Sequence, residues 1–490
     1  MLPGPGSGMS NRPPRLTGDV GSPVALYFMN HSLKFEPELL RRYDKAGPRY
    51  TSYPTAVQFH QGFGEQEYRA WAARSNDVNR APPLSLYVHL PFCDTVCYYC
   101  ACNKVVTKDH SRAAPYLQRL FREIAFQGAL FDRSRRVDQL HWGGGTPTFI
   151  SPAEMRALMA SLSEHFSLRS DDGGEYSIEI DPRTAGEPTI RMLRELGFNR
   201  ISLGVQDFDP MVQKAVNRVQ SEQETMAVLD AAREHGFRSV NIDLIYGLPH
   251  QSRESFARTL DRVIAAGPER LSVFNYAHLP ELFKPQRRIK AEDLPSAAEK
   301  LDILQLTIEK LGTAGYVYIC MDHFARPDDE LAIAQRNGTL YRNFQGYSTH
   351  ADCDLVGLGV SAIGKIGGSY SQNVRTLDEY NSAIDADRLP VMRGIELSND
   401  DVLRREIITR LICHFELDVD AISERFAIRF ADYFAQELAE LQSMQDDGLL
   451  AVDSHSIRVL PSGKLLIRNI CMVFDRYLRA QKEQRFSKVI

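Results

Sequence analysis

The sequence predicts an α/β protein built on a partial (β/α)6 TIM-like barrel, with an N-terminal segment before it and a mainly helical C-terminal domain after it. Six strand-like runs begin near Ser85, Asp138, Tyr176, Arg200, Ser239 and Arg270, and helical patterns separate them at residues 114–130, 152–166, 187–196, 221–235 and 251–266. Such alternation indicates a parallel sheet with right-handed connections. A closed barrel needs eight units, so we prefer the partial barrel to a doubly wound open sheet, which is the alternative.

The chain divides into four predicted parts. Residues 1–30 are rich in Gly, Pro and Ser, which indicates a flexible tail, and residues 31–83 form an N-terminal segment expected to cover the site. Residues 84–395 hold the barrel with added strands and loops. Residues 396–490 are predicted to be mainly helical, and Ser398 opens a helix with an acidic first turn. This last part carries 13 Lys and Arg against 16 Asp and Glu, which argues against a winged-helix DNA reader.

The composition shows no bias toward nucleic-acid or membrane partners. The 490 residues are 43% hydrophobic and 25% charged, with 58 Lys and Arg against 63 Asp and Glu. No apolar run approaches the roughly 18 residues of a membrane span, and the first residues lack the layout of a secretory signal. Four of the eight cysteines fall within ten positions, which argues against a disulfide framework. We therefore expect a cytoplasmic protein.

The strongest chemical signal is a cluster of thiols in YVHLPFCDTVCYYCACNK, residues 87–104. Cys93, Cys97 and Cys100 follow the spacing C-x-x-x-C-x-x-C, and Cys102 comes two residues later. Thiolates select zinc, copper(I) or iron–sulfur clusters. Structural zinc commonly takes two paired knuckles, and here the remaining cysteines are isolated in the sequence. Three close thiolates can bind three irons of a 4Fe–4S cube and leave the fourth iron open for catalysis; a zinc site is the alternative.

Polar residues lie at the ends of the predicted strands after the thiols. GGGTP, residues 143–147, follows the second strand, Glu179 and Asp181 end the third, Gln206 ends the fourth, and Asp243 lies in the fifth. Each of them taken singly is equally well explained as a solvated strand end. Because the carboxyl ends of parallel strands meet at one rim, we expect these residues to gather in one site with the thiols.

The cysteine spacing resembles that of the radical S-adenosylmethionine (SAM) superfamily. Between about Pro48 and Ile490 the chain is also similar to the oxygen-independent coproporphyrinogen III oxidase family, in the motifs CDTVCYYCACNK, HWGGGTPT, IEIDPR, LGVQDF, NIDLIYGLP, FNYAHLP, MDHFARPDDELA, NFQGY and GVSAI. The fourth cysteine distinguishes that family from its relatives. Two departures are visible: Tyr99 stands where Phe is frequent, and Ala101 stands where Gly is usual.

The resemblance implies roles for individual residues. The cluster ligands would be Cys93, Cys97 and Cys100. A first SAM, chelated by the open iron, would contact Tyr87, Gly144, Glu179 and Ile363. A second SAM would contact Tyr99, Gly145, Thr146, Gln206, Arg218, Asp243 and Ala277. Glycines let backbone amides approach a ligand, and carboxylates suit ribose hydroxyls or a sulfonium.

Four further residues carry weaker expectations. We expect Cys102 to act catalytically near the second SAM or the substrate, and not to ligate the cluster. Phe344 and Gln345 are expected near the active site, although a loop packing on the barrel explains them almost equally well. His89 is either a polar contact of the site or a structural histidine.

The implied reaction is the oxidative decarboxylation of two propionates of coproporphyrinogen III to vinyl groups, which gives protoporphyrinogen IX in anaerobic haem biosynthesis. The β-carbon hydrogen is not acidic enough for a side-chain base, so a carbon radical is required. The four substrate carboxylates predict cationic contacts, for which Arg49, Lys104, Arg326 and Arg342 are candidates.

Further partners follow from the same resemblance. We expect a flavodoxin- or ferredoxin-like reductant, an electron acceptor and a monomeric enzyme, with no nucleic acid and no membrane. The alternative function is that of a haem-binding, chaperone-like relative without oxidase activity. Cys102 favours the oxidase, because such relatives lack the fourth cysteine.

Overall fold

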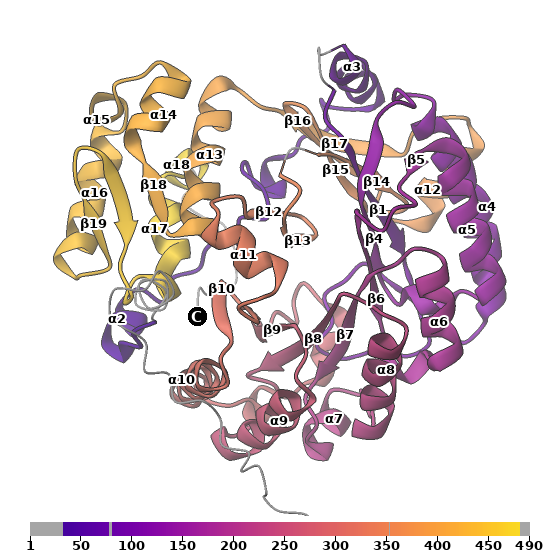
Figure 1. Cartoon of the computed structure of the whole chain (residues 1–490), viewed down its shortest axis with the longest axis horizontal. Helices are drawn as coiled ribbons and strands as arrows, with labels where there is room; N and C mark the ends of the chain where they lie inside the picture. Colours follow the sequence, from indigo (N-terminus) through magenta and orange to yellow (C-terminus); the bar gives the residue numbers. More distant parts are fainter. Residues whose placement is uncertain (1–32, 78–80, 352, 481–490) are drawn as a thin grey trace, which may run out of the picture.

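A twisted, open sheet of thirteen strands organises the computed structural model, which describes residues 33–77, 81–351 and 353–480 (Figure 1). Six neighbouring strands are parallel and follow one another in chain order: β1 (Leu84–Leu90), β4 (Arg136–Gly144), β6 (Glu175–Ile180), β7 (Arg200–Gln206), β8 (Ser239–Tyr246) and β9 (Arg270–Asn275). These are the six predicted strands. Their order never reverses, as it would in a doubly wound sheet, so the partial barrel is confirmed.

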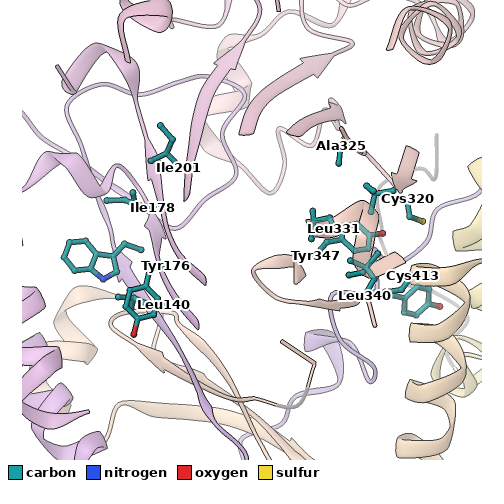
Figure 2. Close-up of a cluster of buried hydrophobic side chains, with 14 of the residues drawn as sticks. Leu140, Tyr176, Ile178, Ile201, Cys320, Ala325, Leu331, Leu340, Tyr347 and Cys413 are labelled. Carbon is teal, nitrogen blue, oxygen red and sulfur yellow. The ribbon is translucent and has the colours of Figure 1, made fainter. Parts of the chain in front are cut away.

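Helices connect consecutive barrel strands and cover the outer face of the sheet (Figure 1). They are α4 (Ala113–Gly128), α5 (Pro152–His165), α6 (Glu187–Glu195), α7 (Pro210–Ala215), α8 (Glu222–Glu234) and α9 (Arg253–Ala266). Ser151, Ser221 and Ser252 begin α5, α8 and α9 with reciprocal caps, which satisfy free amides of the first turn. Leu140 and Ile178, shown in Figure 2, alternate along β4 and β6 with residues that face the barrel interior.

The sheet extends beyond the barrel at both edges. Next to β1 lie the parallel β14 (Asp354–Leu358) and the antiparallel β15 (Ile363–Ile366), β16 (Ser369–Asn373) and β17 (Val391–Glu396). Next to β9 lie the antiparallel β11 (His323–Ala325) and β10 (Val317–Cys320). The remaining short strands are β2 (Phe92–Cys93), β3 (Val105–Val106), β5 (Ser167–Leu168) and the hairpin β12 (Tyr341–Asn343) and β13 (Gly346–Ser348). The helices of this region are α10 (Ala297–Thr313), α11 (Glu330–Arg336) and α12 (Leu377–Asp385).

The C-terminal part begins with α13 (Asn399–His414), whose N-cap Ser398 accepts a hydrogen bond from the Asp401 amide. It continues through α14 (Val419–Phe426), α15 (Phe430–Tyr433), α16 (Ala435–Asp446), α17 (Ile467–Val473) and α18 (Arg476–Ala480). Its sheet has three strands, β18 (Glu416–Asp418), β20 (Ser456–Val459) and β19 (Leu450–Val452), one more than the sequence suggests. Leu340, Tyr347 and Cys413 pack where this part meets β12, β13 and α11 (Figure 2).

The N-terminal segment carries α2 (Pro37–Arg42) and α3 (Glu65–Asn76), joined by an irregular stretch that contacts the C-terminal helices. The Tyr50 hydroxyl donates to Asp475 at 3.0 Å, and the Tyr53 hydroxyl accepts from the Arg476 amide at 3.2 Å. The predicted flexible tail, residues 1–30, lies outside the described residues. Within residues 33–77, 81–351 and 353–480, no helix is long and apolar enough to cross a membrane.

Gly359, which follows β14, has a conformation that only glycine adopts without strain. Its φ is +95°, and a Cβ there would lie 2.8 Å from the His89 carbonyl oxygen. Gly359→Ala should therefore lower the free energy of unfolding by about 2–3 kcal/mol. Gly236→Ala is the matched control, because φ is +76° there but a Cβ meets nothing within 4 Å. Urea unfolding measures both, and equal losses would show that the contact with His89 contributes nothing.

Candidate functional site

The carboxyl ends of the barrel strands open into one cavity of about 560 Å³. Twelve residues predicted from the sequence to form the site line it: Cys93, Cys97, Tyr99, Cys100, Cys102, Gly144, Gly145, Thr146, Glu179, Gln206, Arg218 and Asp243. They come from five loops and strands that are far apart in the chain. The structure thus brings the thiols and the polar strand ends together at one rim, as expected.

Tyr87 and Ile363 do not line this cavity but lie together in the barrel wall. The Tyr87 hydroxyl is 3.0 Å from His89 Nδ1, and its ring stacks on His141 at 5.8 Å between centroids. Tyr87 of β1 is the strand partner of Gly357 in β14. Gly357 in turn packs against Ile363, because a Cβ added to Gly357 would lie 2.7 Å from the Ile363 carbonyl oxygen. His89 also contacts the Asn103 carbonyl oxygen through Nε2 at 3.0 Å, so both its ring nitrogens are engaged and its role is structural.

Ala277 lines a separate cavity of about 450 Å³ beyond the end of β9, yet it is connected to Tyr99. Gln286 Nε2 donates to the carbonyl oxygen of Tyr99 at 3.0 Å and to that of Ala277 at 3.3 Å. The Gln286 oxygen accepts from the Leu279 amide at 2.6 Å, and the side chain is buried. Gln286 thus positions two predicted cofactor contacts. Gln286 was not predicted because it lies in a short 3-10 helix, Lys284–Arg288, that no motif marks.

Two of the three thiols of the predicted cluster site accept a side-chain hydrogen bond, and the backbone of the third is held by Lys104. Thr146 Oγ1 donates to Cys93 Sγ at 3.5 Å, and Arg218 Nη1 donates to Cys97 Sγ at 3.6 Å. Lys104 Nζ donates to the Cys100 carbonyl oxygen at 3.1 Å. Burial raises the pKa of Cys93 to about 11, so this thiol stays protonated until a metal takes the place of the proton.

Cys102 is tied to Cys100 by a hydrogen bond between their sulfur atoms. This bond, with support from Lys104, lowers the pKa of Cys100. The same bond and the neighbouring Cys100 charge raise the pKa of Cys102 well above its usual value. The fourth cysteine therefore adjoins the cluster site as a thiol, in keeping with the expectation that it has a separate role.

Arg218 lies buried at the centre of an ion-pair network that the sequence did not reveal. Its Nη1 is 3.1 Å from Asp181 Oδ2, which also accepts from Arg183 Nη2 at 2.6 Å. Nη2 donates to the Gly204 carbonyl oxygen at 2.6 Å. The two guanidinium groups outweigh burial and lower the pKa of Asp181. The Nε atom of Arg218 has no hydrogen-bond partner among the described residues, which leaves a donor for a bound group.

A smaller cavity of about 210 Å³ continues into the barrel interior. Glu179, Ser202 and Asp243 line both cavities. Asp243 accepts from Ser202 Oγ at 2.9 Å and from Asn241 Nδ2 at 2.8 Å, and burial raises its pKa to about 6. Gln345 also lines the inner cavity, and neither polar atom of its amide has a partner in the described part of the chain.

Four cationic side chains were expected to contact the substrate carboxylates, and of these only Lys104 lines the main cavity. Arg49 forms an ion pair with Asp322 at 2.7 Å, and Arg326 donates to the Gly267 carbonyl oxygen at 3.5 Å on the surface. Arg342 stacks on the Tyr347 ring at 4.6 Å. Phe344 packs edge-on against Tyr370 at 5.8 Å. These four side chains line neither the main nor the inner cavity.

The residues present fit an iron–sulfur cluster with a ligand beside it. Three thiols on one wall offer the soft donors that such clusters take, each thiolate binding a different iron. Gly144 lines the cavity with φ of +115°, and a Cβ there would lie 2.7 Å from the His89 ring, so the position favours glycine. Among the described residues, no three His, Cys, Asp or Glu side chains are arranged as ligands of a single metal ion.

Comparison with known proteins gives consistent matches over this architecture. The model of the radical SAM superfamily matches residues 87–263, and the HemN C-terminal domain model matches residues 397–466. An oxygen-independent coproporphyrinogen III oxidase of Pseudomonas aeruginosa is 57% identical over 462 residues, which cover 94% of this chain and 100% of that protein. The protein of the same name from Escherichia coli is 53% identical and covers 92% of this chain and 98% of its own length.

A solved structure agrees with these matches. The structure described as coproporphyrinogen III oxidase (HemN) from Escherichia coli, a radical SAM enzyme, superposes with a TM-score of 0.87 at 51% sequence identity. The superposition covers 91% of this chain and 100% of that one. The barrel, the added strands and the C-terminal part therefore share one arrangement in both proteins.

Proposed function

Because the chain belongs to the oxygen-independent coproporphyrinogen III oxidase family, we propose that it converts coproporphyrinogen III to protoporphyrinogen IX in haem biosynthesis. The reaction is the oxidative decarboxylation of two propionates to vinyl groups. The observation that carries the proposal is the single cavity in which Cys93, Cys97, Cys100 and Cys102 meet the polar ends of four further strands.

The radical SAM superfamily implies a 4Fe–4S cluster and SAM as cofactors. When bound, they supply a carbon-centred radical able to remove a hydrogen atom from an unactivated carbon. We assign Cys93, Cys97 and Cys100 as cluster ligands, with a first SAM at Tyr87, Gly144, Glu179 and Ile363. We further propose a second SAM at Tyr99, Gly145, Thr146, Gln206, Arg218, Asp243 and Ala277.

The geometry gives several side chains a specific task in this proposal. Arg218, held by Asp181 and the Gly204 carbonyl oxygen, presents a fixed positive charge beside Cys97. Asp243 is oriented by two donated hydrogen bonds and can accept from a ribose hydroxyl. Lys104, which lines the same cavity, supplies a cation for a substrate carboxylate. Cys102, which lines the same cavity, is the proposed donor to the substrate or the second SAM.

We also propose an electron donor and an electron acceptor for this reaction. The reaction needs one electron for each SAM cleaved, for which a flavodoxin- or ferredoxin-like protein in the cytoplasm is the proposed source. It also needs an acceptor for the electron left after decarboxylation. We propose that the enzyme acts as a monomer.

An anaerobic assay tests this function directly. The cluster-loaded protein with SAM, a strong reductant and coproporphyrinogen III should produce protoporphyrinogen IX, detected as the oxidised porphyrin by chromatography. Omission of SAM is the control and should abolish the product. A protein that holds its cluster and binds haem but forms no vinyl groups would instead be the haem-binding, chaperone-like relative.

A further inference from the structure

A cavity of about 520 Å³ lies outside the catalytic site and shares no lining residue with either of the two cavities described there. It is bounded by β12, β15, α13 and α14, so it sits where the sheet extension meets the C-terminal part (Figure 1). Lys365 of β15, Arg405 and Arg410 of α13, and Arg425 of α14 line it. Nothing in the proposed reaction uses these four cations.

The charges of this cavity do not balance. Among the described residues that line it, Glu406 is the only acidic one, and it is already engaged on two sides. Arg410 Nε lies 3.0 Å from Glu406 Oε1, and Arg425 Nη1 lies 3.2 Å from the same atom. Within the described ranges, neither Lys365 nor Arg405 has a carboxylate oxygen within 4.0 Å. Among the described lining residues, Lys365 and Arg405 are therefore two cations without a paired carboxylate.

The Arg405 side chain is hydrogen-bonded to Tyr370, but this contact does not satisfy all of its donors. Lys365 Nζ lies 5.3 Å from the centroid of the Tyr341 ring, and burial together with Arg405 lowers its pKa. Nη1 of Arg405 and Nδ1 of His414 are buried, and neither has a hydrogen-bond partner in the described part of the chain. A cation or polar donor removed from water without a partner is costly, so this arrangement calls for an anion.

We propose that this cavity binds the phosphate group of a small molecule between Lys365 and Arg405. The cations reach the cavity from three separate elements, β15, α13 and α14. A phosphate group offers three strong acceptor oxygens in different directions, whereas a carboxylate is planar and pairs edge-on with a single arginine. The bound group bridges the sheet extension and the C-terminal part. The site is independent of the radical chemistry and does not rest on the proposed substrate.

Thermal unfolding of the full-length, cluster-loaded protein tests the site, with inorganic phosphate as the probe at constant ionic strength under anaerobic conditions. Phosphate should raise Tm by about 2 °C or more and saturate, because a ligand that binds only the folded state stabilises it. Sodium chloride at the same ionic strength should not. Calorimetric titration should show that Lys365→Met and Arg405→Met each weaken phosphate binding at least about tenfold.

Arg388→Met is the matched control, since Arg388 is exposed and lies outside the cavity. It should leave phosphate affinity unchanged. Lys365→Met should also raise Tm in the absence of phosphate, because it removes a cation next to Arg405, so loss of binding cannot be confused with loss of folding. Equal stabilisation by chloride, or unchanged affinity in Arg405→Met, overturns the proposal. Binding of citrate without binding of phosphate overturns the phosphate assignment.

Discussion

Cys97→Ala should yield a folded protein that holds no 4Fe–4S cluster and has no oxidase activity. Cys97 is buried in the wall of the main cavity, and its sulfur is 3.6 Å from Arg218 Nη1. Loss of one of three thiolates leaves an iron without a protein ligand, so the expected loss of iron is essentially complete. Iron and sulfide content, the visible absorbance of the cluster and SAM cleavage measure this outcome.

Cys102→Ser is the matched variant, because it changes a thiol two residues from the last ligand. It should keep the iron content of the unchanged protein and lose turnover. The opposite pKa shifts of the neighbouring thiols, lowered at Cys100 and raised at Cys102, support this separation. Loss of iron in Cys102→Ser to the same extent as in Cys97→Ala would contradict the assignment of three ligands.

The barrel was predictable because its strands and helices carry local signals. Each of the six parallel strands is a short apolar run, and helices such as α5 and α8 begin with a serine cap followed by Glu three residues later. β14 gave no such signal, although it pairs in parallel with β1. β14 is five residues long and lies more than 260 positions from β1 in the chain. Local sequence patterns do not show which distant strands will pair.

The site was predictable where a motif or a strand end marked it, and not where tertiary contacts made it. Glu179 and Asp243 lie on the inward face of strands, so alternation alone places them at the rim. Gln286 lies in no quoted motif, and its role comes from its contacts with the carbonyl oxygens of Tyr99 and Ala277. Arg183 ends the motif IEIDPR, but its ion pair with Asp181 was not predicted. Arg218 was predicted as a site residue only from the family resemblance. Its burial and its ion pair with Asp181 explain physically how it is held at the cavity.

Asp354, the first residue of β14, connects three segments that the sequence does not link. Its Oδ2 accepts from Arg135 Nη2 at 2.6 Å and from the Ser75 hydroxyl, and its Oδ1 accepts from the Gly367 amide at 2.8 Å. The side chains of Arg135 and Asp354 are only 1% and 4% exposed. The pair therefore fastens α3, the start of β4 and the β15–β16 turn to the strand that extends the barrel.

Arg135→Met and Asp354→Leu should each lower the free energy of unfolding by about 3–5 kcal/mol, because each leaves a buried charge without its partner. The double variant should lose clearly less than the sum, since no charge then remains buried, and this coupling separates the ion pair from simple packing. Arg122→Met is the surface control: Arg122 is 42% exposed, and its pairs with Asp385 and Asp387 should contribute less than about 1 kcal/mol. Urea unfolding gives all four values. Additive losses in the double variant would mean that Arg135 and Asp354 stabilise the fold independently, which would contradict a stabilising role for their ion pair.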